Sequence, residues 1–111
     1  MTVTEIEGAV TRVQLKGRLD AAGADRVGMR FMASLAGVGQ KAVIDMGGVD
    51  FIASLGIRML ISAARTLATK GGAMALYGAT EMVQGVFDDA ALDQLIPISA
   101  TEGEALAAVQ G

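Results

Sequence analysis

The sequence of 111 residues contains neither cysteine nor histidine, and these two absences exclude several kinds of site. Without cysteine the chain has no disulfide, no thiolate nucleophile and no cysteine-ligated metal, which agrees with a reducing compartment. Without histidine it lacks the commonest general base at neutral pH, every histidine-containing catalytic triad and most zinc geometries. We therefore expect that this chain is not an enzyme and holds no cofactor or metal ion.

Aromatic side chains, basic charge and long apolar runs are also scarce. Three phenylalanines, one tyrosine and no tryptophan offer little surface for stacking bases, and 9 basic residues against 12 acidic ones give a net charge of -3. Nucleic acid is therefore not an expected partner. The most apolar stretch, residues 57–68, is too short to cross a bilayer, and the first residues carry no basic leader. We expect a cytoplasmic protein with no membrane insertion.

The order of hydrophobic patterns predicts one α/β domain over residues 1–111, since hydrophobic residues make up 52% of the chain and no linker or repeat divides it. Two β-rich runs, residues 3–6 and 10–15 with Gly8 between them, predict a hairpin. The elements expected after it are a helix over 24–35, a central strand over 42–44 that ends at 45–48, a helix over 57–68, a strand over 74–77, a helix over 81–87, an edge strand over 96–98 and a helix over 105–109 opened by a capping box of Thr101 and Glu104. This order predicts a mixed β-sheet, an initial hairpin followed by parallel crossovers, with about four helices.

The segment over residues 43–57 carries the functional signal. It places Ser54 in the turn between a buried strand and a long helix, where unpaired N–H groups and the positive end of the helix dipole tolerate an anion. A phosphate there would put close to two negative charges on a surface that Phe51, Ile52 and Leu55 make apolar, which can eject a partner without unfolding the chain. On the residues alone, the alternative that Ser54 is only a helix N-cap stays open.

The same segment resembles the STAS domain, a family named for sulfate transporters and anti-sigma factor antagonists. The resemblance also includes Gly17-Arg18-Leu19-Asp20 before the segment and Lys70-Gly71-Gly72 after it. Its most specific part, residues 51–56, is similar to the family's aromatic-x-Asp-Ser-(Ser/Thr)-Gly signature. Ala53 stands where that signature has aspartate, and Leu55 stands where it has serine or threonine. The resemblance implies a STAS-like fold over the whole chain.

The resemblance further implies an anti-sigma factor antagonist, with Ser54 as phosphoacceptor. Such a protein binds an anti-sigma factor serine kinase of the GHKL type while it is unphosphorylated, which releases a sigma factor, and phosphorylation by that kinase ends the complex. A PP2C-type phosphatase is a further partner that the resemblance implies. The expected partner-binding residues are Asp20, Phe51, Ile52, Ala53, Leu55, Gly56 and Arg58.

Several alternatives stay open at this stage. Ala53 and Leu55 also suit a permanent docking surface, as in a STAS accessory subunit of a membrane transporter or ABC ATPase complex. Asp20 also fits a simple turn residue. Arg58 and Arg65 fit either a solvated helix face or residues that pair with acidic side chains of a partner, and Arg58 is the nearer to Ser54. A response-regulator receiver with Asp45 as phosphoacceptor is disfavoured, since the acidic pair and the lysine that a receiver needs are not visible.

Overall fold

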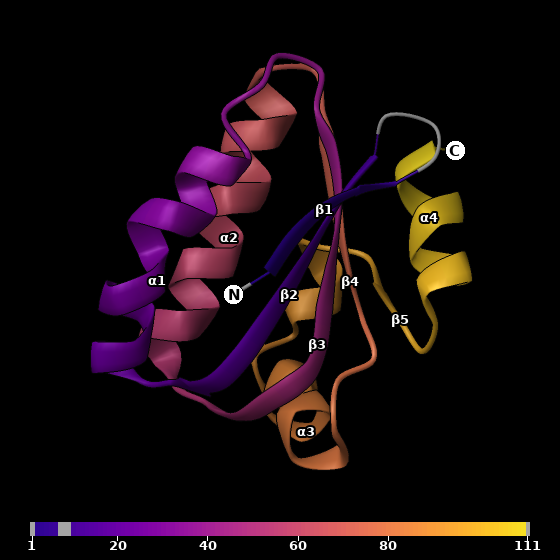
Figure 1. Ribbon diagram of the computed structural model, residues 1–111. Helices are drawn as coiled ribbons and strands as arrows, with labels where there is room; N and C mark the ends of the chain where they lie inside the picture. Colours follow the sequence, from indigo (N-terminus) through magenta and orange to yellow (C-terminus); the bar gives the residue numbers. More distant parts are fainter. Residues whose placement is uncertain (1, 7–9, 111) are drawn as a thin grey trace.

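The computed structural model describes residues 2–6 and 10–110, which fold around one five-stranded sheet (Figure 1). The strand order is β1-β2-β3-β4-β5; β1 runs antiparallel to β2, and the other neighbouring pairs are parallel. The elements are β1 (Thr2–Ile6), β2 (Val10–Leu19), α1 (Ala21–Ser34), β3 (Lys41–Ile52), α2 (Ser54–Thr69), β4 (Ala73–Tyr77), α3 (Glu81–Asp89), the 3-10 helix η1 (Leu92–Gln94), β5 (Ile98–Ser99) and α4 (Glu102–Gln110).

This architecture confirms the predicted mixed sheet, the initial antiparallel pair and the four α-helices among the described residues. The predicted turn at Gly8 lies outside the described residues. The prediction that the central strand ends at residues 45–48 was wrong, because β3 continues to Ile52. Gly47 and Gly48 remain in the strand where its register with β2 shifts, and a side chain at Gly48 would meet the carbonyl oxygen of Leu15 at 2.9 Å.

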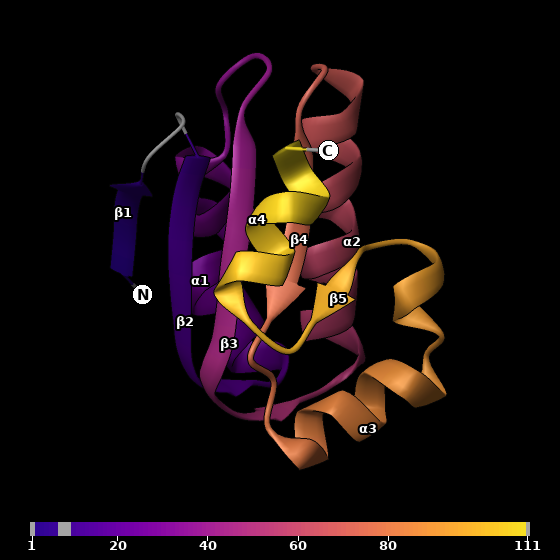
Figure 2. The same ribbon diagram turned by 90° about the vertical axis from the view of Figure 1, so that its right-hand side faces the viewer.

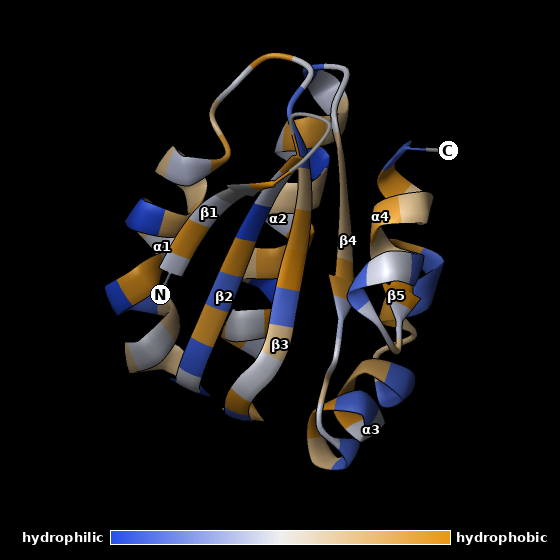
Figure 3. Ribbon diagram, turned by 45° about the vertical axis from the view of Figure 1, so that its right-hand side comes forward, coloured by the Kyte–Doolittle hydropathy of each residue, from blue (hydrophilic) through white to orange (hydrophobic). Residues whose placement is uncertain are grey.

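The helices cover the two faces of the sheet unequally. Helices α1 and α2 lie side by side on one face, and α4 lies on the other (Figure 1). The larger core lies under α1, α2 and α3 and includes the fully buried Phe31, Leu60 and Phe87. Under α4 is a smaller cluster that includes Val10 and Val43. Because both faces need apolar residues, β2 and β3 alternate in hydropathy only along parts of their length (Figure 3).

The apolar stripe of α2 packs against the sheet much as its spacing predicts. Ile57, Leu60 and Leu67 are buried, whereas Ala68, which was expected on the stripe, is exposed and Ala63 is buried in its place. The helix is therefore rotated slightly from the expected face. None of the helices that the structure describes is long and apolar enough to cross a lipid bilayer.

A polar network fastens α4 to the sheet. Arg12 Nη1 on β2 donates to Glu102 Oε1 at 2.9 Å, and the Tyr77 hydroxyl on β4 donates to the same oxygen at 3.0 Å. The hydrogen bond from Arg12 lowers the pKa of Glu102, and burial is the main cause that raises the pKa of Tyr77. The network thus joins three elements through one carboxylate at the start of α4.

Candidate functional site

Ser54 is the first residue of α2, immediately beyond the carboxyl end of β3. The N-cap is Ala53, in extended conformation with φ -109 and ψ 176. Its N–H donates to the carbonyl oxygen of Leu19 at 3.0 Å, and helical bonding begins with Ile57 N–H donating to Ala53 at 3.1 Å. The structure therefore gives the capping position to Ala53, so the alternative in which Ser54 is only an N-cap does not describe this helix.

The start of α2 has no side-chain cap. The first N–H groups of any helix have no acceptor within the helix, and the methyl group of Ala53 provides none. The Ser54 side chain is exposed, and its hydroxyl makes no hydrogen bond with another residue that the structure describes. The site thus combines an accessible hydroxyl with the partial positive charge of a helix N-terminus, an environment that favours a negative group on that oxygen.

Asp20, which was expected beside Ser54, caps the neighbouring helix α1. Its Oδ1 accepts the N–H of Gly23 at 2.9 Å, and this hydrogen bond is the main reason why the pKa of Asp20 is lowered. Its Oδ2 accepts from Arg18 Nε at 3.4 Å, and the Arg18 guanidinium lies 4.4 Å from the centre of the Phe51 ring. The ends of β2 and β3 and the start of α1 are therefore joined by Asp20, Arg18 and Phe51.

Two residues of the expected partner surface are buried instead. Ile52 is 2% exposed, and Gly56 packs so closely on β2 that a side chain there would lie 2.6 Å from the Leu19 carbonyl oxygen. They hold the Ser54 segment against the sheet and do not belong to its surface. The alternation along β3 explains the burial of Ile52, since it follows the half-buried Phe51 and points to the opposite face. By contrast, Leu55 is 46% exposed, and Arg58 is exposed one turn beyond Ser54.

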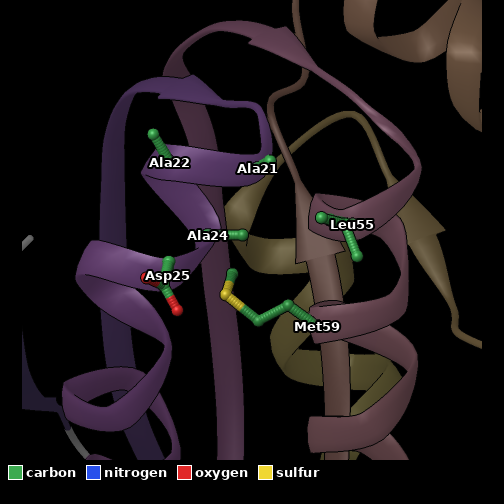
Figure 4. Close-up of a pocket in the computed structure, with 6 residues that line it drawn as sticks. All are labelled: Ala21, Ala22, Ala24, Asp25, Leu55 and Met59. Atoms are coloured by element: carbon green, nitrogen blue, oxygen red, sulfur yellow. The ribbon is translucent and has the colours of Figure 1, made fainter.

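Grooves flank the start of α2 on both sides. Toward α1, a groove lies between Leu55, Met59 and the small side chains that open α1, and Figure 4 shows the Met59 side chain extending from α2 toward Asp25. Toward α3, a second and mainly apolar groove is lined by Ser54, Ile57, Arg58, Val86, Asp89 and Ala90. The exposed end of α2 is therefore a ridge between two depressions, a shape that another protein can cover.

Sequence reasoning missed the contributions of α3 and of Met59 to this site. Val86 and Asp89 are more than 30 positions from Ser54, and nothing in their local pattern indicates that they face it. Only the crossover after β4, which brings α3 beside α2, places them there (Figure 2).

Asp45 does not occupy a phosphoacceptor position. It lies in the middle of β3, where its carboxylate accepts the Gly47 N–H at 2.8 Å and the Gln14 side-chain amide at 3.3 Å. Seven further strand residues separate it from the carboxyl end of β3, where Ser54 lies. The receiver alternative is thus at odds with the geometry, because a strand-end aspartate is its first requirement.

Comparison with known proteins finds relatives along almost the whole chain. The model of the STAS domain family matches residues 1–105. BtrV of Bordetella bronchiseptica, which by its name is grouped with the anti-sigma factor antagonists, is 25% identical over 108 residues, covering 97% of this chain and 92% of BtrV. A solved STAS domain protein from Planctomyces limnophilus, described as an anti-sigma-factor antagonist, has a TM-score of 0.85 at 26% identity and covers 97% of this chain and 95% of that one.

Two solved structures of SpoIIAA, one unphosphorylated and one phosphorylated, share this fold. The unphosphorylated form of the anti-sigma factor antagonist SpoIIAA has a TM-score of 0.76 at 20% identity, over 99% of this chain and 96% of that one. The phosphorylated form of SpoIIAA, a Bacillus cell fate determinant, has a TM-score of 0.68 at 19% identity, over 97% of both chains. At these identities the likeness is one of fold.

Proposed function

The chain belongs to the STAS domain family, and on this basis we propose that it is an anti-sigma factor antagonist whose surface around Ser54 binds an anti-sigma factor serine kinase. While Ser54 is free, the chain occupies a kinase of the GHKL type and a sigma factor is released. The kinase transfers the γ-phosphoryl group of ATP to Ser54 Oγ, ADP leaves, and the complex ends. A PP2C-type phosphatase removes the phosphate and restores binding. The chain is the substrate of these reactions and does no chemistry itself.

The observation that carries the proposal is that Ser54 is an exposed residue, at an uncapped helix start between two grooves. A kinase can reach this oxygen without unfolding any element. A phosphate on it gains from the helix dipole, so the modified chain stays folded. The same phosphate brings close to two negative charges beside Leu55 and Ile57. Burying that charge in an apolar interface has a desolvation free energy larger than the favourable free energy of the apolar contact, so the complex is destabilised.

Affinity capture with phosphosite mapping tests the proposal. The unmodified chain and Ser54→Ala should recover a GHKL-type serine kinase, whereas Ser54→Asp should not. Ala107→Asp is the matched control, because it adds the same charge at an exposed position of α4, away from the Ser54 surface. Incubation with the recovered kinase and ATP should place one phosphate on Ser54.

Two outcomes would contradict the proposal. Equal recovery of the kinase by Ser54→Ala and Ser54→Asp would show that charge at this position does not control the complex. Recovery of a transport ATPase by every variant, with no phosphate on Ser54, would instead identify an accessory subunit of a transporter, in which Ala53 and Leu55 form part of a permanent contact.

A further inference from the structure

Two grooves follow one another along the same flank of α2, on the side opposite the groove that faces α1. The first, at the start of the helix, contains Ser54 and Ile57 and faces α3. The second, further along, is lined by Ile61, Ala64, Arg65, Ala68, Leu95 and Ile96. The α2 residues of both grooves recur at three- and four-residue spacing, so they form one strip along the helix. From Ser54 to Ala68 the strip is about 21 Å long, which is the length of a four-turn helix.

The floor of this strip is apolar and partly exposed. Ile57 and Ile96 are buried at its base, Ile61 and Ala64 are half-buried, and Leu95 is 56% exposed at its outer wall. An exposed leucine beside half-buried apolar side chains marks surface that gains from being covered. An amphipathic helix fits such a strip, since its own apolar residues recur at the same spacing.

The charges along the strip indicate which kind of helix fits. Arg58 and Arg65 are exposed on α2 two turns apart, and neither has an ion-pair partner among the described residues. In contrast, Arg12 and Arg18 are each paired with a carboxylate. Asp89 stands on the opposite wall, too far from Arg58 for an ion pair within the described structure. The α2 side of the strip therefore presents two guanidinium groups about 10 Å apart that suit carboxylates on an occupant.

We propose that the strip along α2 from Ser54 to Ala68 receives an amphipathic helix of the partner, with acidic residues two turns apart that pair with Arg58 and Arg65. This inference rests on the proposed function for the identity of the partner as the serine kinase. It adds how the switch at Ser54 acts. A phosphate on Ser54 lies one turn from Arg58, on the N-terminal side that favours an ion pair within a helix. It therefore takes Arg58 away from the partner's carboxylate and repels that carboxylate.

The first test measures the affinity of the purified serine kinase recovered with Ser54→Ala. Arg65→Glu should weaken binding at least tenfold, because it places two carboxylates against each other three turns away from Ser54. Arg30→Glu is the matched control: Arg30 is exposed on α1, outside the strip, and its reversal should change the affinity less than twofold. Both variants change exposed side chains, and their melting temperatures verify that they are folded.

The second test does not depend on the kinase. An 18-residue lactam-bridged helix with leucines at three- and four-residue spacing and glutamates on one flank is titrated into the ¹⁵N-labelled chain, and the same helix with lysines serves as control. The glutamate helix should shift the amide signals of Ile61, Ala64 and Leu95 and bind at least fivefold more tightly than the lysine helix. Arg65→Glu should remove this preference.

The outcomes separate the two proposals. If Ser54→Asp abolishes kinase binding while Arg65→Glu leaves it unchanged and the two peptides bind alike or not at all, the acidic-helix strip is wrong and the proposed function stands. If the glutamate helix binds the strip with the expected preference but no kinase binds any variant, the strip stands and the proposed function fails.

Discussion

Replacing Ala53 with aspartate tests whether the start of α2 lacks a cap. The backbone of Ala53 already has the extended conformation of a capping residue, and its methyl group accepts no hydrogen bond. A carboxylate at this position can accept the N–H of Leu55 or Gly56, and it also interacts favourably with the helix dipole. Ala-to-Asp exchange at an N-cap is worth about 1 kcal/mol. We therefore expect Ala53→Asp to raise the free energy of unfolding by that amount.

The expected shift in melting temperature follows from the size of the domain. An unfolding entropy of about 2.1 cal/mol/K per residue, taken over this chain, converts 1 kcal/mol into a rise of about 4 °C. Urea denaturation at pH 7 measures the free energy, and differential scanning calorimetry measures the midpoint. Ala53→Asn separates the two contributions, because asparagine caps the helix without adding charge. Below about pH 3 the gain from Ala53→Asp should fall toward that of Ala53→Asn, since the carboxylate is then protonated.

If neither variant is more stable than the unmodified chain, the N–H groups at the start of α2 are already satisfied by water at no cost. If Ala53→Asn stabilises and Ala53→Asp does not, the dipole at this end is offset by nearby carboxylates, of which Asp50 and Asp20 are the first candidates.

Two further predictions follow from the packing and from the network at α4. Gly56→Ala should destabilise the chain by about 1–3 kcal/mol, because the new Cβ would lie 2.6 Å from a backbone oxygen. Gly85→Ala, which has open space around it, should stabilise the chain by about 0.5–1 kcal/mol. The two variants should shift the urea midpoint in opposite directions, and equal midpoints would contradict this prediction. The hydrogen bond from Arg12 lowers the pKa of Glu102 in the folded state. Glu102 therefore contributes to the free energy of unfolding above its unfolded pKa of about 4.3, and this contribution is lost as the pH falls through the lower pKa of the folded state. Glu102→Gln should therefore lower the urea midpoint at pH 7. Between pH 5 and pH 3 the urea midpoint of this variant should fall less than that of the unmodified chain. Parallel pH profiles for the two proteins would contradict the role of the ion pair.

Local patterns were sufficient to predict most elements of the fold. The alternation of apolar spacing along the chain predicted the order of the β-strands and α-helices, because each helix has one buried stripe and the inner strands β2, β3 and β4 each contain several buried apolar residues. The predicted helix start at Thr101 is confirmed, since the Glu104 N–H donates to Thr101 Oγ1 at 3.3 Å. Only this half of the capping box forms, because the Glu104 carboxylate accepts the Thr101 hydroxyl at 3.1 Å and not the Thr101 backbone N–H. Gly47 and Gly48 misled the prediction, since two adjacent glycines are typical of a turn but here accommodate a register shift inside a strand.

Only the part of the site that lies within one continuous segment of the chain was predictable from the sequence. Ser54 at a helix start follows from the sequence, and the structure adds that this residue is exposed. Which residues around it face outward could not be predicted, since the two-residue period of β3 had been taken to end before Ile52. The residues that α3 contributes to the groove beside Ser54 depend on a crossover, so no local pattern contains them.

The strand order of the sheet affects how the protein can fold while it is being translated. Its strands stand side by side in the order in which they occur along the chain. During translation, every strand after the first therefore emerges when its partner is already outside the ribosome, and each pairing closes a loop no longer than one helical crossover. Assembly can therefore advance from the amino end in steps, in which each new strand covers the edge of the strand that emerged before it.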